Sequence, residues 1–154
     1  MEMIWKTDVA IARVVCLAHS LKHWTGRELL SGVSSPVELS QKVFEAPFVV
    51  VSHGLEADPV LNCGNRAALT LWEMSWEELI RTPSRLTAEA PGRQERARLL
   101  KTVTQRGFID DYSGIRISIT GWRFRISQAT VWNLLAEDGK PCGQAAMFDR
   151  WEFL

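Results

Sequence analysis

The hydrophobic and polar positions of residues 8–24 recur with the period of a helix. Arg13, Cys16 and Ser20 fall on the side away from the apolar stripe, and Gly26 is suited to end the helix. The apolar stripe consists of Ile11, Val14, Leu17, Ala18, Leu21 and Trp24. We predict an amphipathic N-terminal helix within residues 1–26, followed by a single domain over residues 27–154.

Residues 60–80 predict a short strand, a turn and two short helices. The strand is Val60-Leu61, and the turn covers residues 62–65. The side chain of Asn65 can accept a hydrogen bond from a free backbone N–H of the first helical turn, as an N-cap does. Ser75 and Glu78 have the spacing of a capping box, in which each side chain bonds the other residue's backbone N–H.

The remaining pattern predicts a long helix and further strands. Residues 92–106 read as the helix, with Gly107 as its left-handed end. Apolar β-branched or alternating runs predict strands at residues 48–51, 115–119, 122–135 and 143–148. Asp138-Gly139 favours a type I′ hairpin between the last two. This order of elements predicts an α+β domain with one five-stranded antiparallel sheet and helices on one face.

Charge and composition exclude some classes of function. Lys and Arg together number 18, as do Asp and Glu, so no net field draws the protein to nucleic acid or to an anionic membrane. The apolar run from Val9 to Leu21 carries Arg13 and His19, which a secretory or membrane-spanning segment would lack. We expect a cytoplasmic protein.

The cysteines are Cys16, Cys63 and Cys142, and no Cys/His cluster has the spacing of a zinc site. Reduced, mostly buried thiols are one interpretation. A redox-active cysteine is the other, and it would need a basic neighbour in space.

Titratable residues offer few candidates for catalysis or metal binding. His53 lies near Glu56 and Asp58 in one loop, which suits a catalytic histidine or a loop histidine bonded to a local carboxylate. His19 and His23 are four residues apart on a helix, but the sequence lacks an accompanying H-E-x-x-H motif. Asp110 and Asp111 are adjacent on a strand and therefore point to opposite faces. We predict no catalytic or metal-binding residues from these patterns.

Aromatic and amide side chains on the longest strand are better candidates for a ligand site. Trp122, Phe124, Gln128 and Trp132 share one parity unless a bulge intervenes, and Trp72 on the preceding helix would meet them. A mostly apolar wall with a few polar groups is how small-molecule pockets are built. We predict that these five residues line a ligand site, although the same wall could be a filled core.

Several separate sequence blocks resemble one known family, the MEKHLA domain. These blocks lie between about residues 40 and 150 and read SHGLEADPVLNCGNRAALTLWEMSWEEL, PSRLTAEAP, GFIDDYSGIRISITGWRFRI and ATVWNLLAEDGKPCGQAAMF. The resemblance implies a PAS-like fold. It also implies a role in sensing or protein association, with relatives among bacterial and algal proteins and at the C-terminal end of plant homeodomain–leucine zipper regulators. It implies no catalytic residues.

The chain departs from PAS domains that bind known cofactors. Flavin-binding light sensors carry a reactive Cys in an Asn-Cys-Arg motif before the long helix, where this chain reads RLTAEAPGRQER. They also place a Gln two residues after a Gly on the last strand. Here Gln144 directly follows Gly143, which predicts the opposite face. Haem-binding PAS domains use a His on the long helix, and residues 92–106 contain none. We therefore expect neither flavin nor haem.

The leading hypothesis is a PAS-like sensory or protein-interaction module without enzymatic activity. It would bind a small molecule between sheet and helices. It would signal through a protein partner or a homodimer, using the N-terminal helix or the open face of the sheet. The alternative is a small enzyme or carrier that uses the same pocket with His53, Asp58 or the Asp110–Asp111 pair. The discriminating observation is a titratable group at the wall of a cavity.

Overall fold

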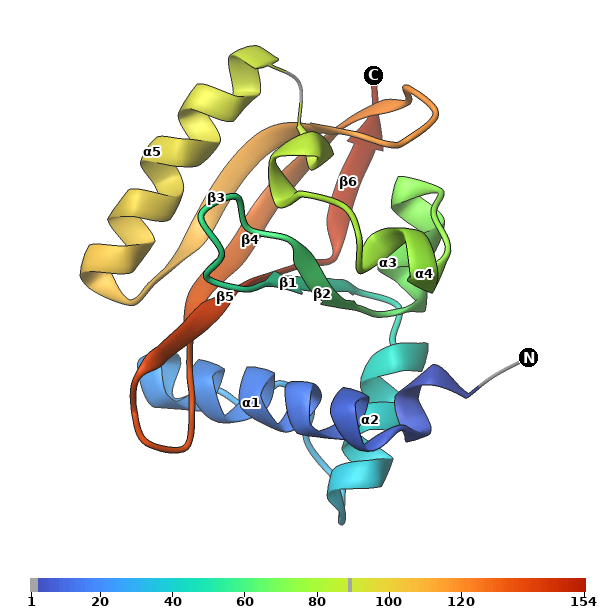
Figure 1. Cartoon of the computed structure of the whole chain (residues 1–154), viewed down its shortest axis with the longest axis vertical. Coiled ribbons are helices and arrows are strands. Elements are labelled where there is room, and N and C mark those ends of the chain that lie inside the picture. The colour runs from blue at the N-terminus through green and yellow to red at the C-terminus, as the bar shows by residue number, and fades with distance from the viewer. Residues whose placement is uncertain (1–2, 89) are drawn as a thin grey trace.

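The computed structural model describes residues 3–88 and 90–154, which fold around an antiparallel sheet (Figure 1). The order of its strands is β2-β1-β5-β4-β3, with β6 beside β4 where β5 ends. The strands are β1 (Val49–His53), β2 (Leu61–Gly64), β3 (Phe108–Ile117), β4 (Arg123–Leu135), β5 (Pro141–Phe148) and β6 (Arg150–Phe153). The predicted α+β class and antiparallel sheet are confirmed, and β6 is an element that the sequence pattern missed.

Helices cover both faces of the sheet, above and below it in Figure 1. One face carries α3 (Arg66–Trp72), α4 (Trp76–Leu79), the 3-10 helix η2 (Ser84–Thr87) and α5 (Ala90–Arg106). The other carries the 3-10 helix η1 (Ile4–Lys6), α1 (Asp8–Thr25) and α2 (Pro36–Glu45). The predicted N-terminal helix therefore packs on the face that the other predicted helices leave open.

Local hydrogen bonds set the helix ends as the sequence predicts. Asn65 caps α3, and its side chain accepts from the backbone N–H of Ala68. The capping box of Ser75 and Glu78 is complete in both directions. Gly107 follows α5 with φ of 97°, a left-handed conformation that favours glycine.

Two predicted turns differ from the structure. The turn at residues 62–65 is wrong, because Cys63 and Gly64 continue β2 and pair with Ser52 and Val51 of β1. The hairpin near Asp138 is not type I′, because Gly139 has a positive φ and Asp138 does not. Ala136 and Lys140 instead close a three-residue loop, in which a type I turn precedes one left-handed residue.

A β-bulge in β4 divides the predicted aromatic wall between the two faces of the sheet. Ile126 pairs with Gly114 and Ala129 pairs with Tyr112, so β4 has one extra residue between these pairs. The bulge lies at Gln128, whose φ is 53°. The extra residue reverses the side-chain alternation beyond it. The expectation of one shared face is therefore wrong for the residues on either side of Gln128.

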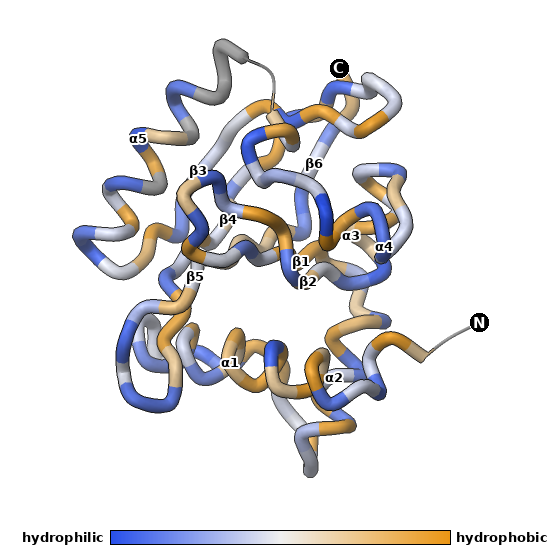
Figure 2. The backbone as a smooth tube through the Cα atoms, viewed as in Figure 1, coloured by the Kyte–Doolittle hydropathy of each residue, from blue (hydrophilic) through white to orange (hydrophobic). Residues whose placement is uncertain are grey.

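Two apolar layers result, one on each face of the sheet. Trp72 and Phe124 belong to the layer under α3, whereas Trp132 belongs to the layer under α1. The α1 layer also contains Leu17 and Leu21, each of which stabilises the fold by about 1.5–3 kcal/mol when fully buried. Figure 2 shows hydrophobic residues in β2 and along α1, and hydrophilic residues in the loop between β4 and β5.

The face of α1 that contacts the sheet is rotated from the predicted stripe. Ser20, predicted to point away, is fully buried, and its hydroxyl accepts a hydrogen bond from the backbone N–H of Leu135. Cys16, also predicted to point away, contacts the carbonyl of Leu135 through its thiol. The reason is that the end of β4 presents backbone polar groups to α1, and these need polar partners when buried.

None of the described helices combines the length and apolarity that crossing a bilayer would require.

Candidate functional site: a cavity between the sheet and the upper helices

A cavity lies between the sheet and the helices α3, η2 and α5. It offers about 60 Å³ to the centres of water-sized molecules, which is room for roughly four of them. Most of its wall is apolar and comes from β1, β2, α3, β4 and β5. The main apolar contributors are Val51, Leu61, Trp72, Ile126, Val131 and Phe148.

Besides Ser52, five polar side chains share this wall with the apolar ones. All are buried or half-buried, and they come from four elements far apart in sequence. They are His53 of β1, Thr87 of η2, Tyr112 and Arg116 of β3, and Gln144 of β5. A concave apolar site with a few converging polar groups is the usual form of a small-molecule pocket.

Tyr112 and Arg116 form one unit above Gly114. The Nη2 of Arg116 donates to the Tyr112 hydroxyl across 2.9 Å, and the guanidinium carbon lies 5.2 Å from the centre of the Tyr112 ring. A Cβ at residue 114 would come within 2.3 Å of the Tyr112 oxygen. Glycine at this position therefore allows the tyrosine and the arginine to fold together over the strand.

Gln144 lies in register with residues of the two neighbouring strands. It pairs with His53 of β1 and with Asn133 of β4, so the three side chains share a face of the sheet. Its Nε2 donates to the Asn133 side-chain oxygen at 2.9 Å and to the Thr104 hydroxyl at 3.1 Å. Asn133 in turn donates to the carbonyl of Val103 in α5.

The predicted orientation of Gln144 is therefore wrong, because its side chain lines the cavity. The pairing of β4 with β5 is irregular between Gly143 and Pro141, which face Leu134 and Leu135. Gly143 itself has φ of 157°, and a Cβ there would come within 2.2 Å of the His53 carbonyl oxygen. The number of residues between Gly143 and Gln144 does not predict the face on which Gln144 lies, because side chains do not alternate regularly at such an irregularity.

The imidazole of His53 is buried at the cavity wall. Its Nδ1 lies 2.9 Å from the carbonyl oxygen of Gly54. A carbonyl oxygen only accepts, so Nδ1 carries the proton in this bond, and Nε2 is the acceptor nitrogen of the neutral ring. A titratable side chain, the feature that would discriminate between the two hypotheses, is thus present at the cavity wall.

Trp72 lines the cavity from α3 and is 3% exposed. Its ring meets Phe124 and Phe148 edge to face, with centroids 5.5 and 6.1 Å away. Among the residues that the structure describes, no acceptor lies within hydrogen-bonding distance of its indole Nε1. A buried indole N–H usually has a hydrogen-bond partner, so an unpaired donor at the cavity wall is unusual.

The other residues predicted for the site lie in different places. Phe124 is fully buried in the core next to Trp72. Trp122 is 58% exposed and contacts Phe153 on the surface. Gln128 is exposed at the bulge, and Trp132 lies on the opposite face under α1. Of the five predicted residues, the structure places Trp72 at the cavity wall.

The carboxylates of the alternative hypothesis lie outside the cavity. Asp58 forms an exposed ion pair with Arg85 at 3.1 Å. Asp110 is exposed and lies 3.8 Å from Arg27, and Asp111 is also exposed. Both helix histidines, His19 and His23, are exposed as well. Within residues 3–88 and 90–154, no three metal-ligating side chains gather in one place.

Sequence reasoning missed Arg116 because it alternates with isoleucines. Ile115 and Ile117 are only half-buried and Ile119 is exposed, whereas Arg116 is 7% exposed. Arg116 pairs with Phe124 of β4, so it shares the face of that buried ring. No local pattern signals this, because the burial of an edge strand depends on which face the helices cover.

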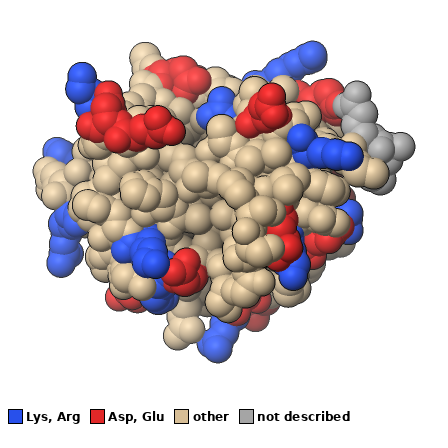
Figure 3. Space-filling view, turned by 90° about the horizontal axis from the view of Figure 1, so that it is seen from below, with Lys and Arg blue, Asp and Glu red and all other residues tan. Residues whose placement is uncertain are grey.

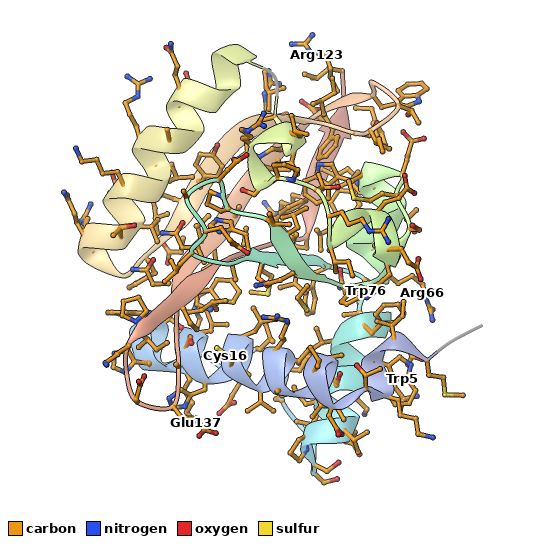
Figure 4. The ribbon with its side chains drawn as sticks, in the orientation of Figure 1. Trp5, Cys16, Arg66, Trp76, Arg123 and Glu137 are labelled. Atoms are coloured by element: carbon orange, nitrogen blue, oxygen red, sulfur yellow. The ribbon has the colours of Figure 1, made fainter. Side chains whose placement is uncertain are left out.

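Two of the cysteines lie close together although they are far apart in sequence. Cys16 projects from α1 (Figure 4), and its sulfur lies 3.7 Å from that of Cys142 in β5. Burial, followed by the proximity of Cys16, raises the pKa of Cys142 to about 11. Burial also raises the pKa of the Cys63 thiol to about 11.

A family model for the MEKHLA domain matches residues 11–153. Two curated proteins, the homeobox-leucine zipper protein HOX10 of Oryza sativa subsp. indica and that of subsp. japonica, are each 26% identical to this chain over 145 residues. The aligned segment covers 94% of this chain but 17% of either relative, so the chain spans a small part of their length.

Solved structures with PAS-like folds are similar to this chain. The PAS domain of a protein from Colwellia psychrerythraea has a TM-score of 0.59 and 15% identity, over 75% of this chain and 92% of that one. An RNA-binding light-oxygen-voltage receptor has a TM-score of 0.66 and 17% identity, over 80% of this chain and 36% of that one. A light-oxygen-voltage domain studied with a flavin analogue has a TM-score of 0.56 and 12% identity, over 75% and 84% of the two chains. These likenesses show a PAS-like fold.

Proposed function

The chain belongs to the MEKHLA domain family, and from this membership and its PAS-like fold we propose that it is a sensory module. The stimulus is a small molecule that binds in the cavity between the sheet and the helices α3, η2 and α5. The response is a change in how α1 packs, which a protein partner or a second copy of the chain detects.

One observation carries the ligand-binding part of the proposal. Buried polar side chains from separate strands, namely His53, Arg116 and Gln144, converge on a cavity whose remaining wall is mostly apolar. A core that served packing alone would fill this space with apolar side chains, because burying polar groups costs free energy unless they are well paired. The indole N–H of Trp72, which has no acceptor among the described residues, supports the same interpretation.

Asn133 offers a physical link between the cavity and α1. Its side chain bonds Gln144 at the cavity wall, while its backbone carbonyl accepts a hydrogen bond from the indole of Trp24 in α1 at 2.9 Å. The preceding residue on β4, Trp132, donates to the carbonyl of Leu17 in the same helix. A ligand that shifts Gln144 would therefore act on a strand that directly holds α1.

The outer side of α1 and α2 is the surface we propose for the partner. Val9, Val15 and Val37 are exposed there. Figure 3 views the molecule from this side, and charged side chains lie mainly around the rim of the view, with an uncharged area across its centre. With 18 basic and 18 acidic residues, the chain suits neither a nucleic acid nor an anionic membrane as its partner.

Native mass spectrometry of the protein purified from its own host tests the proposal. We expect a bound small molecule in substoichiometric or full amount. The Trp72→Phe variant should retain less of it, whereas the matched Trp122→Phe variant, changed on the surface, should retain as much as the wild type. Hydrogen exchange in α1 should differ between the ligand-loaded and stripped protein. An empty cavity and identical exchange in both preparations would contradict the proposal.

A second candidate function rests on the position of His53 at the cavity wall. A histidine there could serve as a general base in a small enzyme or carrier, as the alternative hypothesis requires. Incubating the purified protein with the molecule recovered from it separates the two candidates. A sensor returns this molecule unchanged, whereas an enzyme converts it to a product. In the second case His53→Gln should stop the conversion while binding persists.

A further inference from the structure

Arg116 is a buried cation at the cavity wall. It is 7% exposed, and its guanidinium donates to two neutral oxygens, the Ile115 carbonyl at 3.0 Å and the Tyr112 hydroxyl at 2.9 Å. Within the described part of the chain, no carboxylate lies within ion-pairing distance of it. The guanidinium has five N–H donors, and its bonds to the described residues use only two of them.

A buried charge without a counter-ion is unusual in a folded protein. Proteins pair buried charges because removing a charge from water is costly, and contact with an aromatic ring offsets only part of this cost. The glycine at residue 114, which leaves room for the Tyr112–Arg116 unit, indicates that the fold accommodates the arginine in this place. An anion that entered the cavity would supply the missing partner.

We propose that the ligand of the cavity is a compact organic acid with one carboxylate, which pairs with Arg116. This inference rests on the proposed function, because it names the chemical class of the ligand at the same site. The planar guanidinium matches a carboxylate through two parallel hydrogen bonds. The rest of the acid lies against the apolar wall, near Trp72, Ile126 and Phe148.

A carboxylate fits the wall better than a phosphate does. Arg116 is the one permanently charged side chain that lines the described cavity. One guanidinium neutralises one carboxylate. A phosphate group carries up to two negative charges near neutral pH and would leave one of them unmatched in an apolar site.

Pairs of acids and their neutral amides test this inference. The probes are benzoate with benzamide, hexanoate with hexanamide, and 3-phenylpropanoate with its amide, followed by tryptophan fluorescence and calorimetry. We expect at least one acid to bind the wild type at least about tenfold more tightly than its amide. In Arg116→Gln that acid should lose at least about thirtyfold in affinity, while the amide should keep its affinity.

Two further variants control for a general loss of positive charge and for loss of folding. Arg125→Gln removes the same charge from an exposed position of β4, where Arg125 pairs with Glu152 at 3.2 Å, and it should preserve the preference for the acid. Arg116→Lys keeps a cation at the site. If Arg116→Gln fails to fold, Arg116→Lys replaces it in the test, and it should keep part of the wild-type affinity for the acid.

The outcomes separate this inference from the proposed function. If neither acids nor amides bind, and no molecule is recovered from the host protein, both are wrong. If amides bind as tightly as acids, or if Arg116→Gln leaves the preference unchanged, the carboxylate assignment alone is overturned. Tighter binding of inorganic phosphate than of every acid would also overturn it.

Discussion

The indole Nε1 of Trp132 in β4 donates a hydrogen bond to the backbone carbonyl of Leu17 in α1, 3.2 Å away. Both residues are buried, so this bond holds the N-terminal helix to the sheet at the centre of an apolar layer. The bulge at Gln128 makes the contact possible, because without it Trp132 would point to the other face.

We expect Trp132→Phe to destabilise the protein by about 1–3 kcal/mol. The variant loses one buried hydrogen bond and leaves part of the indole volume empty. Urea unfolding followed by circular dichroism measures the change. Trp122→Phe is the matched control, because its ring is exposed, and it should change the free energy of unfolding by less than about 0.5 kcal/mol. Equal effects of the two substitutions would show that the bond to α1 contributes little.

Deleting residues 1–26 should leave a folded core that aggregates or changes its oligomeric state. The deletion uncovers the apolar layer that contains Val50, Trp132 and Leu134. An exposed apolar patch of this kind promotes association with another protein surface. Light scattering and analytical ultracentrifugation measure the association. A truncated protein with unchanged thermal stability and unchanged association would mean that α1 is an independent appendage.

Asn65→Ala should cost about 3 kcal/mol or more, because its buried amide serves four backbone groups. The side-chain oxygen accepts from Val50 and Ala68, and the side-chain nitrogen donates to the carbonyls of Val43 and Phe48. Removing it takes away the cap of α3 and leaves buried groups unpaired. Ser75→Ala, which removes an exposed cap, should cost only about 1 kcal/mol in the same unfolding measurement. Similar costs for the two variants would contradict the central role of Asn65.

Oxidised glutathione should join Cys16 to Cys142 and leave Cys63 as a thiol. The two sulfurs lie 3.7 Å apart, whereas Cys63 is buried. The protein thiols lose two protons and two electrons, and glutathione disulfide is reduced to two thiols. The thiolate is the attacking form, and the pKa of Cys142 lies at about 11. The reaction should therefore accelerate as pH rises toward 11. Peptide mapping identifies the linked residues, and a disulfide to Cys63 would contradict the assignment.

The purified protein should be colourless. The expectation comes from the sequence, which lacks the reactive Cys motif of flavin-binding light sensors and a His within residues 92–106. Absorption spectra before and after desalting provide the measurement. A visible band that survives desalting and is released by denaturation would show that a cofactor occupies the cavity.

Sequence alone determined the features that depend on neighbouring residues. The caps at Asn65 and at Ser75 are hydrogen bonds within one helical turn, so residue type and spacing specify them. The amphipathic period of α1 likewise follows from the order of its side chains, as does the left-handed end of α5 at Gly107. These local signals, with the alternation of the strands, were enough to predict the α+β sheet.

The tertiary structure decided which face each strand residue occupies. One extra residue at Gln128 moved Trp132 to the α1 side, and the irregularity next to Gly143 turned Gln144 toward the cavity. Arg116 and Cys16 acquired their environments from segments far along the chain, since Phe124 lies opposite one and Cys142 touches the other. A sequence pattern cannot supply these placements, because a bulge reverses the alternation and long-range packing selects the covered face.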